Sequence, residues 1–307
     1  MKKFIVFLFL VCIFGIVYVN RNSIINFVLR NVVSKNEVVF AEPNEYYKDY
    51  DYIYVQNTTN LYPSSKHDIL NIIYSTLNRG VDEVVFYCAD GYNDCINDIN
   101  NIAEDSLVLA TINNFVHPYN SYSKIYFSIN DYGKVKINVS KNYSDEDIEL
   151  INNKLDEILD SLFYDGMSDY DKIKAFHDYI INNTSYDSSV SIESQIYNKT
   201  DSSIAKGLLF NGKAICSGYS DTMAIFLNKL GINNYKISSD EHIWNLVYID
   251  GSWKHIDATW DDPITVDGRN VLIHDFFLLS TDDLFNKEKN IEKNNHQFDR
   301  SLYLEAN

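Results

Sequence analysis

The pattern of hydrophobic and polar positions begins with an apolar run, Phe4–Val19, of sixteen residues that carry no charge. As a helix this run would span about 24 Å at about 1.5 Å per residue, somewhat less than the roughly 30 Å of a hydrocarbon core. Lys2, Lys3 and Arg21 flank the run, and such side chains can snorkel to cover the mismatch. The pattern predicts an uncleaved signal anchor over residues 1–22.

A cleaved signal peptide is the alternative to an anchor. Cleavage requires a small-x-small site directly after the apolar run, whereas Val39-Phe40-Ala41 comes about twenty residues later. The run is followed instead by Asn20-Arg21-Asn22. In both cases we expect the body of the protein outside the cytoplasm. It would be membrane-anchored and facing the extracellular side in the first case, and secreted in the second.

The next region, residues 49–140, has the pattern of a small α/β module that follows a stalk or linker over residues 23–48. The expected elements are a strand over Tyr52–Gln56, a helix capped by Ser64-Ser65, a strand over Val84–Cys88, a mainly helical stretch over Asp94–Asn113, and a hairpin of Lys124–Ile129 with Lys134–Ser140. His67 and His117 are isolated in this region and are interpreted as ordinary surface or core histidines. The role of the module stays open.

The C-terminal region, residues 141–307, starts with helical spacing. Ser144 opens a long helix with a capping-box pattern and acidic residues at the positive end of its dipole. A second helix is expected near Ser168–Asn182, where His177 lies on the apolar face and is interpreted as structural. A third helix is expected from Ser217 onwards, with one apolar stripe of Met223, Phe226, Leu227 and Leu230.

Two strand-like runs near the C-terminus predict a hairpin. Ile243–Ile249 and Ser252–Thr259 are separated by Asp250-Gly251, a strong signal for a two-residue turn. If Ile249 pairs with Ser252, His242 and Asp257 fall on the same face as diagonal neighbours, about 7 Å apart between backbones. A three-residue loop would put the two side chains on opposite faces. The hairpin therefore predicts a His–Asp pair.

Composition and charge limit the functional classes. With 307 residues, 46% of them apolar, and 17 Phe and 24 Tyr, the chain can bury the cores of two ordinary domains. The formal net charge of −17 is spread along the chain. Such a field repels phosphate backbones, so we expect no nucleic-acid partner.

Cysteine usage fits an exported chain. Cys12 lies in the apolar run, and Cys88 and Cys95 flank a short loop that could close a disulfide. Two buried free thiols at these positions are an equal alternative. Cys216 has no obvious partner in either case, and a leftover thiol in an exported protein is a candidate reactive group.

Cys216 lies at the junction between a loop and the third helix. A cysteine that points inward is usually a packing residue, but the first turn of a helix also favours a thiolate. If the helix packs its stripe on the face of the hairpin that carries His242 and Asp257, a Cys–His–Asp arrangement results. The histidine would take the thiol proton, the carboxylate would orient the ring, and the thiolate could form a thioester acyl-enzyme. The Cys216 N–H is a natural oxyanion donor.

These residues lie in three stretches that have the form of sequence motifs. They are Asn-Gly-Lys-Ala-Ile-Cys-Ser-Gly-Tyr-Ser at 211–220, Glu-His-Ile-Trp-Asn at 241–245 and Trp-Lys-His-Ile-Asp-Ala-Thr-Trp-Asp-Asp-Pro at 253–263. In order and spacing they resemble the bacterial transglutaminase-like superfamily. The likeness covers residues 145 to 283 and leaves out the N-terminal module.

The resemblance implies an α+β fold with a papain-like transglutaminase core. In that core a helix carrying the cysteine packs on an antiparallel sheet carrying the histidine and the aspartate, here preceded by the small α/β module and the anchor. The resemblance assigns the catalytic triad to Cys216, His242 and Asp257. The family includes protein crosslinkers, cysteine peptidases, peptide deglycosylating enzymes and inactive scaffolds, and the presence of all three triad positions argues against a decayed copy.

Neighbouring residues have two interpretations each. Tyr219, Trp244 and Trp260 are candidates for the walls of a substrate groove, with core aromatics as the alternative. His255 shares the face of His242 and Asp257, so a metal site that includes Cys216 is conceivable, but the ligand spacing is not that of a tight metal motif. We expect no metal and no cofactor.

The sequence therefore predicts an extracytoplasmic thiol enzyme that acts on protein or peptide substrates, which could lie at the cell surface, and that contacts the membrane through its N-terminal segment. It would pass the acyl group to an amine or to water. A noncatalytic surface module with a peptide-binding groove is the alternative from another functional class.

Overall fold

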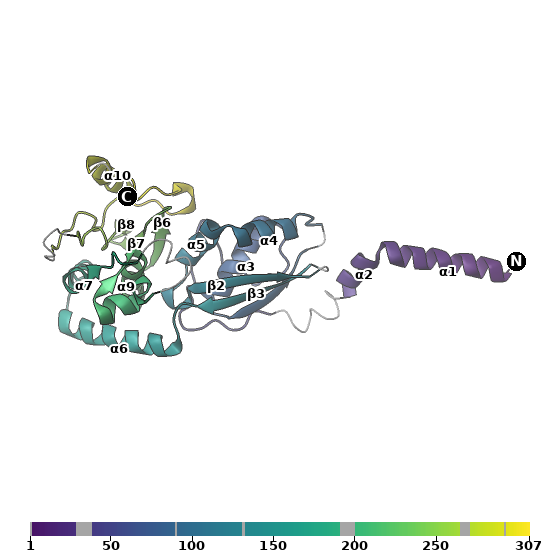
Figure 1. Ribbon diagram of the computed structural model, residues 1–307, viewed down its shortest axis with the longest axis horizontal. Helices are drawn as coiled ribbons and strands as arrows, with labels where there is room; N and C mark the ends of the chain where they lie inside the picture. Colours follow the sequence, from purple (N-terminus) through teal and green to yellow (C-terminus); the bar gives the residue numbers. More distant parts are fainter. Residues whose placement is uncertain are drawn as a thin grey trace.

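The computed structural model describes residues 2–28, 39–89, 91–130, 133–190, 200–264, 271–291 and 293–307. The apolar N-terminal run forms helix α1 (Lys2–Val19), which is followed by the shorter helix α2 (Arg21–Val28) (Figure 1). Within the described ranges, no helix is both long and apolar enough to cross a membrane. The signal anchor stays a prediction, and residues 29–38 of the expected stalk lie outside the described residues.

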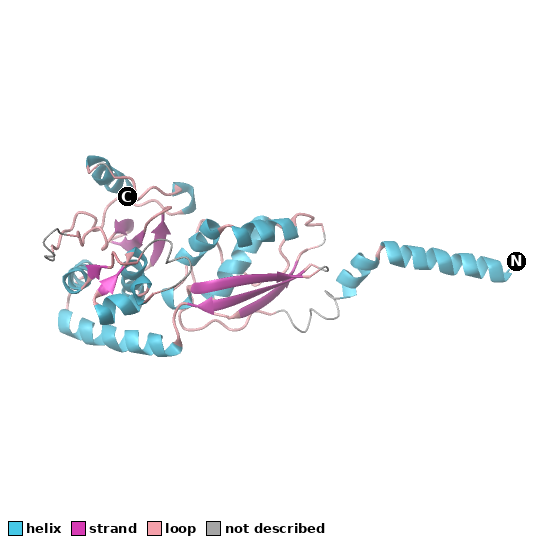
Figure 2. Cartoon of the chain, in the orientation of Figure 1, coloured by secondary structure: helices cyan, strands magenta, loops and turns pink. Residues whose placement is uncertain are grey.

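A three-stranded antiparallel sheet, with the strand order β1-β3-β2, forms the middle of the chain. The elements of this region are α3 (Lys66–Asn78), β1 (Glu83–Tyr87), α4 (Cys95–Glu104), α5 (Ser106–Asn114), β2 (Tyr122–Ile129) and β3 (Lys134–Lys141). The three helices cover one face of the sheet (Figures 1 and 2). Strands β2 and β3 form the expected hairpin, and Ser65 caps α3 by accepting the N–H of Asp68.

One element predicted for this region is wrong. Tyr52–Gln56 is not a strand in the structure. The segment lies beside helix α3 and not beside a sheet edge. The backbone N–H of Gln56 donates to Asn71 at 2.8 Å, and that of Thr58 donates to Ser75 at 2.8 Å. The backbone donors are thus satisfied by α3, and the segment runs along this helix without strand pairing.

Helices and a second antiparallel sheet make up the C-terminal region. Its elements are α6 (Asp145–Leu162), α7 (Asp169–Asn183), β4 (Ser185–Tyr186), β5 (Lys213–Ala214), α9 (Cys216–Lys229), β6 (Asn234–Ser238), β7 (Ile243–Ile249), β8 (Ser252–Ile256) and α10 (Thr281–Asn290). Strands β6, β7 and β8 are neighbours in that order, and the short strands β4 and β5 pair in parallel. The capping box at Ser144 and the three expected helices are confirmed.

The β7–β8 hairpin has the predicted register, with Ile249 opposite Ser252. Asp250 and Gly251 have positive φ angles of 51° and 81°, as a type I′ turn requires at both central positions. The sequence therefore specified the two-residue turn and with it the alternation of every side chain along both strands.

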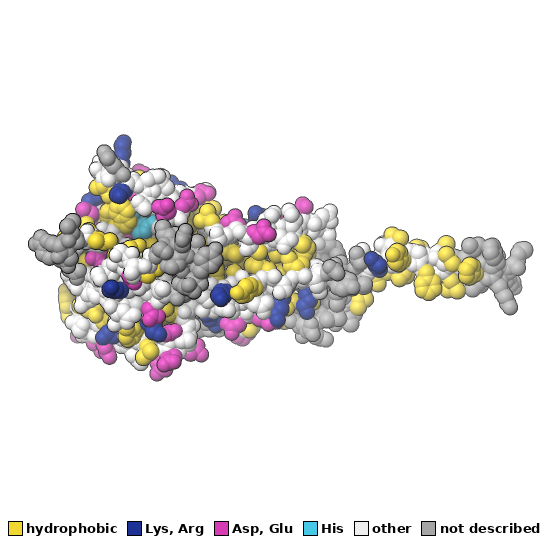
Figure 3. Space-filling view, in the orientation of Figure 1, with side chains coloured by type: hydrophobic (Ala, Val, Ile, Leu, Met, Phe, Trp, Pro, Cys, Tyr) yellow, Lys and Arg dark blue, Asp and Glu magenta, His cyan; other side chains and the backbone are white. Residues whose placement is uncertain are grey.

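Two apolar cores share the second sheet. One face of the sheet packs with the module in a core that contains Tyr52 and Phe115 together with Tyr235 of β6. The other face packs against α9, in a core that also contains residues of α6 and α7. The acidic side chains are scattered over the visible surface of the molecule rather than gathered in one patch (Figure 3).

Candidate active site

Cys216 is the first residue of α9 and is buried, with 8% of its surface exposed. The preceding residue, Ile215, has an extended backbone, so the chain turns sharply into the helix. Gly218 allows this corner to pack closely, because a Cβ atom there would lie 2.4 Å from the carbonyl oxygen of Ser202. The first amide groups of a helix have no intrahelical acceptor. The N–H groups of Cys216 and Ser217 are therefore suited to hydrogen-bond an anion beside the thiol.

His242 lies between the thiol and a carboxylate. Its Nε2 donates to Oδ2 of Asp257 at 2.5 Å, and a side-chain hydrogen bond joins the same ring to Cys216. Because Nε2 faces Asp257, Nδ1 is the ring nitrogen available to the sulfur. The structure thus brings Cys216, His242 and Asp257 together.

The route by which these residues meet differs from the sequence prediction. The apolar residues of α9 pack with Val247, Ile249 and Ile256, whereas Trp244 and Leu246 face the other core. The condition under which the hairpin predicts the triad, that α9 packs on the His242 face, is therefore not met. The aliphatic alternation of the hairpin matches the apolar stripe of the helix, and the opposite alternation is mostly aromatic.

The three residues meet instead at one edge of the sheet. The β7–β8 ladder ends where Asn245 pairs with Ile256, so His242 and Asp257 lie just beyond the paired residues. The side-chain amide of Asn245 donates to the Ser220 carbonyl of α9 at 2.9 Å, which fixes the helix over this end of the hairpin. Residues beyond the paired part of a strand need not alternate between the two faces of the sheet. Their side chains can therefore turn toward a neighbouring helix terminus.

Asp257 is held by four donors. Its Oδ1 accepts the backbone N–H groups of Thr259 at 2.9 Å and Trp260 at 3.3 Å. Its Oδ2 accepts Nε2 of His242 and also Nε2 of His296, the latter at 2.8 Å. The carboxylate is therefore fixed on both oxygens, and one of its partners, His296, was not among the predicted site residues.

His296 is completely buried and has a second acidic neighbour. Its Nδ1 lies 2.9 Å from Oε1 of Glu288, and the same oxygen accepts the backbone N–H groups of Asn295 and His296. His296 lies 39 residues beyond Asp257 in an asparagine-rich stretch. Neither a periodicity nor a motif marks this stretch in the sequence, so His296 could not be predicted as a site residue.

The pKa shifts in the site favour an ion pair. Burial lowers the pKa of His242, but the charge of Asp257 and the hydrogen bonds to Asp257 and Cys216 outweigh burial and raise that pKa to about 10. Burial raises the pKa of Asp257, whereas the charges and hydrogen bonds of His242 and His296 hold it well below its usual range. The histidine is therefore stabilised as a cation and the aspartate as an anion.

A groove of about 550 Å³ opens at His242. The other lining residues are Tyr186, Glu241, Thr259, Trp260, Asp262, Pro263, Ile264, Lys293 and Asn295. Burial and then the charges of Cys216, Asp187 and Asp257 raise the pKa of the Tyr186 hydroxyl. The groove therefore reaches His242 of the triad and combines aromatic walls with charged groups.

Of the three aromatic candidates for substrate contact, Trp260 alone lines this groove. Trp244 and Tyr219 are each 1% exposed, so their burial contradicts a direct contact with substrate. The indole of Trp244 donates to Nδ1 of His255 at 3.0 Å, and the hydroxyl of Tyr219 donates to Asp262. Both side chains therefore pack behind residues of the site and do not face the groove. Burial raises the pKa of Asp262, the partner of Tyr219, to about 6.

The structure does not assemble the metal site that would include His255. The ring nitrogens of His255 face Trp244 and Thr281, at 3.0 and 3.1 Å. Among the described residues, His242, Asp257 and His296 form one group whose donor atoms are close enough to share an ion. Each of these donors is already engaged in the hydrogen-bonded chain of the site.

A second group of this kind contains His177, Asp178 and His274. Nδ1 of His177 and Nε2 of His274 lie 3.3 and 2.6 Å from Oδ1 of Asp178, and the ammonium of Lys174 bridges Asp178 and His274. A lysine in this place already supplies the positive charge. Nε2 of His177 also lies 3.1 Å from Oδ2 of Asp261, so His177 ties α7 to the segment after β8 and has the structural role expected for it.

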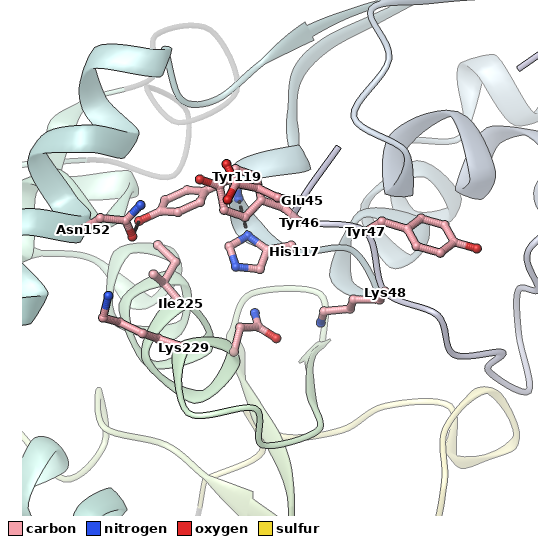
Figure 4. Close-up of a pocket in the computed structure, with 10 residues that line it drawn as sticks. Glu45, Tyr46, Tyr47, Lys48, His117, Tyr119, Asn152, Ile225 and Lys229 are labelled. Carbon is pink, nitrogen blue, oxygen red and sulfur yellow. Dashed lines mark hydrogen bonds between the residues drawn. The ribbon is translucent and has the colours of Figure 1, made fainter. Parts of the chain in front are cut away.

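A separate pocket of about 300 Å³ lies between the module and α9 (Figure 4). It is lined by Glu45, Tyr46, Tyr47, Lys48, His117, Tyr119, Asn152, Ile225, Asn228 and Lys229. His117 is buried and its Nδ1 accepts the N–H of Tyr119 at 3.1 Å, whereas His67 is exposed. The pocket contains none of the triad residues.

Of the two alternatives for the cysteines of the module, a disulfide or two free thiols, the structure has the disulfide. Cys88 and Cys95 are joined by a disulfide that links the end of β1 to the start of α4. Cys12 and Cys216 are free cysteines. The thiol in the site therefore has no cysteine partner.

A thiol, an imidazole and a carboxylate in one hydrogen-bonded chain form the arrangement used by thiol hydrolases and acyltransferases. Comparison with known proteins leads to the same class, because the profile described as the transglutaminase-like superfamily matches residues 157–258. This chain therefore carries a domain of the transglutaminase-like superfamily.

Individual relatives are more distant. Kyphoscoliosis peptidase of Mus musculus is 23% identical over 180 residues, covering 48% of this chain and 26% of that protein. The Homo sapiens protein of the same name is 24% identical over 152 residues, covering 43% and 22%. The chain thus spans about a quarter of the length of these curated relatives.

Two solved structures are also similar. One is a TGase, with a TM-score of 0.34 and 21% identity over 45% of this chain and 44% of the other. The second is a provisionally assigned cysteine protease from Cytophaga hutchinsonii, with a TM-score of 0.28 and 15% identity over 44% of this chain and 61% of the other.

Proposed function

We propose that this protein is an extracytoplasmic cysteine acyl-transfer enzyme that acts on protein or peptide substrates through a thioester intermediate. The observation that supports this proposal most strongly is the hydrogen-bonded chain from Cys216 through His242 to Asp257. Within it, His242 lines a groove and Cys216 is the first residue of a helix. Its parts are those of a nucleophile, a base and an orienting carboxylate.

The first half of the reaction forms the acyl-enzyme. His242 takes the proton of the Cys216 thiol, and the thiolate attacks the carbonyl carbon of a carboxamide or peptide bond, forming a C–S bond and an oxyanion. The N–H at the start of α9 stabilises that charge, aided by the dipole of the helix. His242 then gives its proton to the leaving nitrogen, the C–N bond breaks, and ammonia or an amine departs.

The second half transfers the acyl group. An amine or a water molecule attacks the thioester carbon while His242 accepts a proton from it. The C–S bond breaks, and the thiolate is regenerated beside the histidine cation. An amine acceptor gives crosslinking, and water gives hydrolysis. The residues of the triad serve both outcomes equally, so the acceptor is decided by what the groove admits.

The groove favours a peptide segment as the substrate. Its volume of about 550 Å³ lies within the range of roughly 300–1,000 Å³ that is usual for ligand sites. Trp260 and Tyr186 offer flat apolar surfaces, whereas Glu241 and Lys293 offer opposite charges at its edges. Such a mixture suits a chain of mixed side chains better than a uniformly charged polymer.

We place the reaction outside the cytoplasm. Two features support this location: the apolar N-terminal run ahead of the folded regions, and the disulfide between Cys88 and Cys95, which is a bond typical of oxidising compartments. The N-terminal segment would contact the membrane as a retained anchor, or would be removed from a secreted form. Fractionation of cells that express the full chain tests this, because recovery of the reduced protein in the cytoplasm contradicts it.

A noncatalytic surface module that uses the same groove for peptide binding is the second candidate function. The 8% exposure of the Cys216 surface favours it, since a buried thiol serves packing as well as chemistry. It predicts that Cys216→Ala retains every function of the wild-type protein.

Mass spectrometry of a peptide mixture tests the proposal and separates the two reactions. Wild-type protein is incubated with the peptides and a primary-amine donor, and incorporation of the amine is compared with peptide cleavage. Both products are expected to disappear in Cys216→Ala. Products of equal amount from wild type and Cys216→Ala, or none from either while peptide binding is kept, would contradict the catalytic proposal.

A further inference from the structure

His296 occupies a place that the triad alone does not require. It is fully buried and lies between two acidic side chains, Asp257 and Glu288. Its Nε2 is 2.8 Å from Oδ2 of Asp257, and its Nδ1 is 2.9 Å from Oε1 of Glu288. Buried polar groups of this kind are retained only with hydrogen-bond partners, and here one of the two partners is the catalytic carboxylate itself.

We propose that His296 is a positioning residue of the site: it holds Asp257 in the orientation in which the carboxylate serves His242, and Glu288 holds His296 in turn. This inference rests on the proposed function, because it concerns the same carboxylate. It extends the triad into a chain of five side chains, Glu288, His296, Asp257, His242 and Cys216.

The hydrogen bonds define the direction of this chain. Asp257 accepts on both oxygens, so His296 donates through Nε2. Oε1 of Glu288 already accepts two backbone N–H groups, at 2.6 and 2.9 Å, so it serves as an acceptor for Nδ1 as well. A ring that donates from both nitrogens is an imidazolium, which here lies between the side chains of Glu288 and Asp257.

An aromatic cage surrounds the ring. The ring centroids of Trp244, Trp260 and Phe276 lie 4.7, 5.1 and 5.4 Å from that of His296. The three side chains exclude water from the ring, and the faces of aromatic rings can accommodate a cation. The cage also limits rotation of His296, so the position of its Nε2 is determined by packing as well as by Glu288.

The titratable groups that face His296 come from each element packed around it. They are Glu288 of α10, Asp257 after β8, His242 before β7, and His255 of β8, whose pKa is lowered by burial and by the nearby charge of His296. The two carboxylates are in hydrogen-bond contact with the ring. They therefore dominate the local field over His242, whose positive charge has the opposite effect, whereas His255 is kept neutral by its lowered pKa.

A pair of substitutions separates positioning from simple burial. Both His296→Gln and His296→Asn remove the ring and its charge. The amide nitrogen of Gln corresponds in reach to Nε2 and can still donate to Asp257, whereas that of Asn corresponds to Nδ1 and can donate only to Glu288. His255→Gln is the matched control, because His255 is a similarly buried histidine of β8 whose ring bonds Trp244 and Thr281 instead.

The readout is the rate of Cys216 alkylation by iodoacetamide between pH 5 and 9, followed by peptide mass spectrometry on the full chain. An activated thiol reacts well below the ordinary thiol pKa of about 8.5. We expect the midpoint to move up by a pH unit or more in His296→Asn, which lowers the rate at pH 6 about 10-fold. His296→Gln is expected to stay within about 3-fold of wild type, and His255→Gln to match it.

Two failures are distinguishable. If the wild-type thiol itself reacts like an unfolded thiol, the proposed function is contradicted. If wild type is reactive but the Asn and Gln variants have superimposable profiles, the positioning role of His296 is overturned while the triad stands.

Histidine ¹⁵N NMR of the wild-type protein at pH 6 gives a test that does not depend on whether the variants fold. We expect protons on both ring nitrogens of His296. A ring with an unprotonated Nε2 would overturn the proposal.

Discussion

Asp257 is the residue on which the interactions of the site converge. Two backbone N–H groups hold one oxygen, and two imidazoles share the other. A carboxylate with four donors is strongly stabilised as an anion, and this anion keeps the proton of His242 on the nitrogen that faces away from the sulfur. The orientation of the general base therefore depends on a group that never touches the substrate.

The substitution Asp257→Asn tests this dependence. The amide nitrogen of Asn would face two imidazole nitrogens, so at least one hydrogen bond is lost and the tautomer of His242 is no longer specified. We expect the rate of amine incorporation or peptide cleavage to fall about 10³-fold or more, as in other triads with this change. Product analysis of wild type and variant at equal folded concentration measures it, and a variant with wild-type activity would contradict the role of Asp257.

The shifted pKa of His242 also predicts how stability depends on pH. Because this pKa rises from 6.5 to about 10 on folding, the folded state holds the proton more tightly. The stabilisation is fully present below pH 6.5 and is lost as the pH rises through about 10. Asp257 has a lowered pKa, so its contribution is present above its unfolded value of about 3.9 and is lost in acid.

Thermal unfolding of wild type and His242→Ala from pH 6 to pH 10 measures the effect. We expect the melting temperature of wild type to fall more steeply over this window, so that the difference between the two proteins narrows toward pH 10. Parallel curves would show that the pair does not contribute in the way described.

Among the elements, the β7–β8 hairpin and the start of α9 position the site. The Asp250-Gly251 turn was predictable because a type I′ turn needs two residues that tolerate positive φ, and the register followed from it. The packing of α9 was not predictable in the same way. Both alternations of the hairpin are largely apolar, so the sequence offered two faces, and the aliphatic one packs against the helix.

The contribution of α10 was hidden for a different reason. Glu288 lies near the C-terminal end of a helix that looks like an exposed charged element in the sequence, yet its side chain is buried and bonded to His296. A loop returns His296 to Asp257 after 39 residues. Only tertiary folding brings these residues together, so neither their spacing in the sequence nor the composition of the chain predicts the contact.

The disulfide between Cys88 and Cys95 gives a prediction for the module. It joins β1 to α4 across a sequence separation of 7. A loop of this size corresponds to a stabilisation of about 2 kcal/mol in the chain-entropy treatment. We expect the double variant Cys88→Ser/Cys95→Ser to lose about this much free energy of unfolding in urea titrations, with alkylation of Cys216 in the folded state unchanged. An unchanged free energy of unfolding would contradict the structural role of this bond.

For the whole molecule, the shared core is the main feature. Tyr235 of β6 contacts Tyr52 and Phe115 of the module, with ring centroids 5.3 Å apart in both pairs, and it also contacts Trp253. The sheet that positions the triad is therefore covered on its second face by the module. This explains why the C-terminal region carries large aromatic residues on a face away from α9, where an isolated domain would expose them to water.

Truncation of one aromatic residue tests the coupling of the two regions. Tyr235→Ala removes a side chain that is 1% exposed, and we expect a loss of about 3–4 kcal/mol in the free energy of unfolding. Tyr248→Ala on the neighbouring strand is the control, since Tyr248 is 42% exposed and should cost about 1 kcal/mol or less. Far-UV circular dichroism and tryptophan fluorescence should give coincident urea transitions, whereas two separate transitions would contradict a shared core.

The central claim is that the fold activates Cys216 through His242, and the alkylation rate of this one thiol at pH 6 tests it most directly. Iodoacetamide modification of Cys216 is measured in the native protein, in the same protein unfolded in urea, and in native His242→Ala. We predict that the native thiol reacts at least about 10-fold faster than the unfolded one, because His242 and the start of α9 stabilise the thiolate. This advantage should disappear in His242→Ala. A native rate equal to or below the unfolded rate, and the same in His242→Ala, would contradict the account.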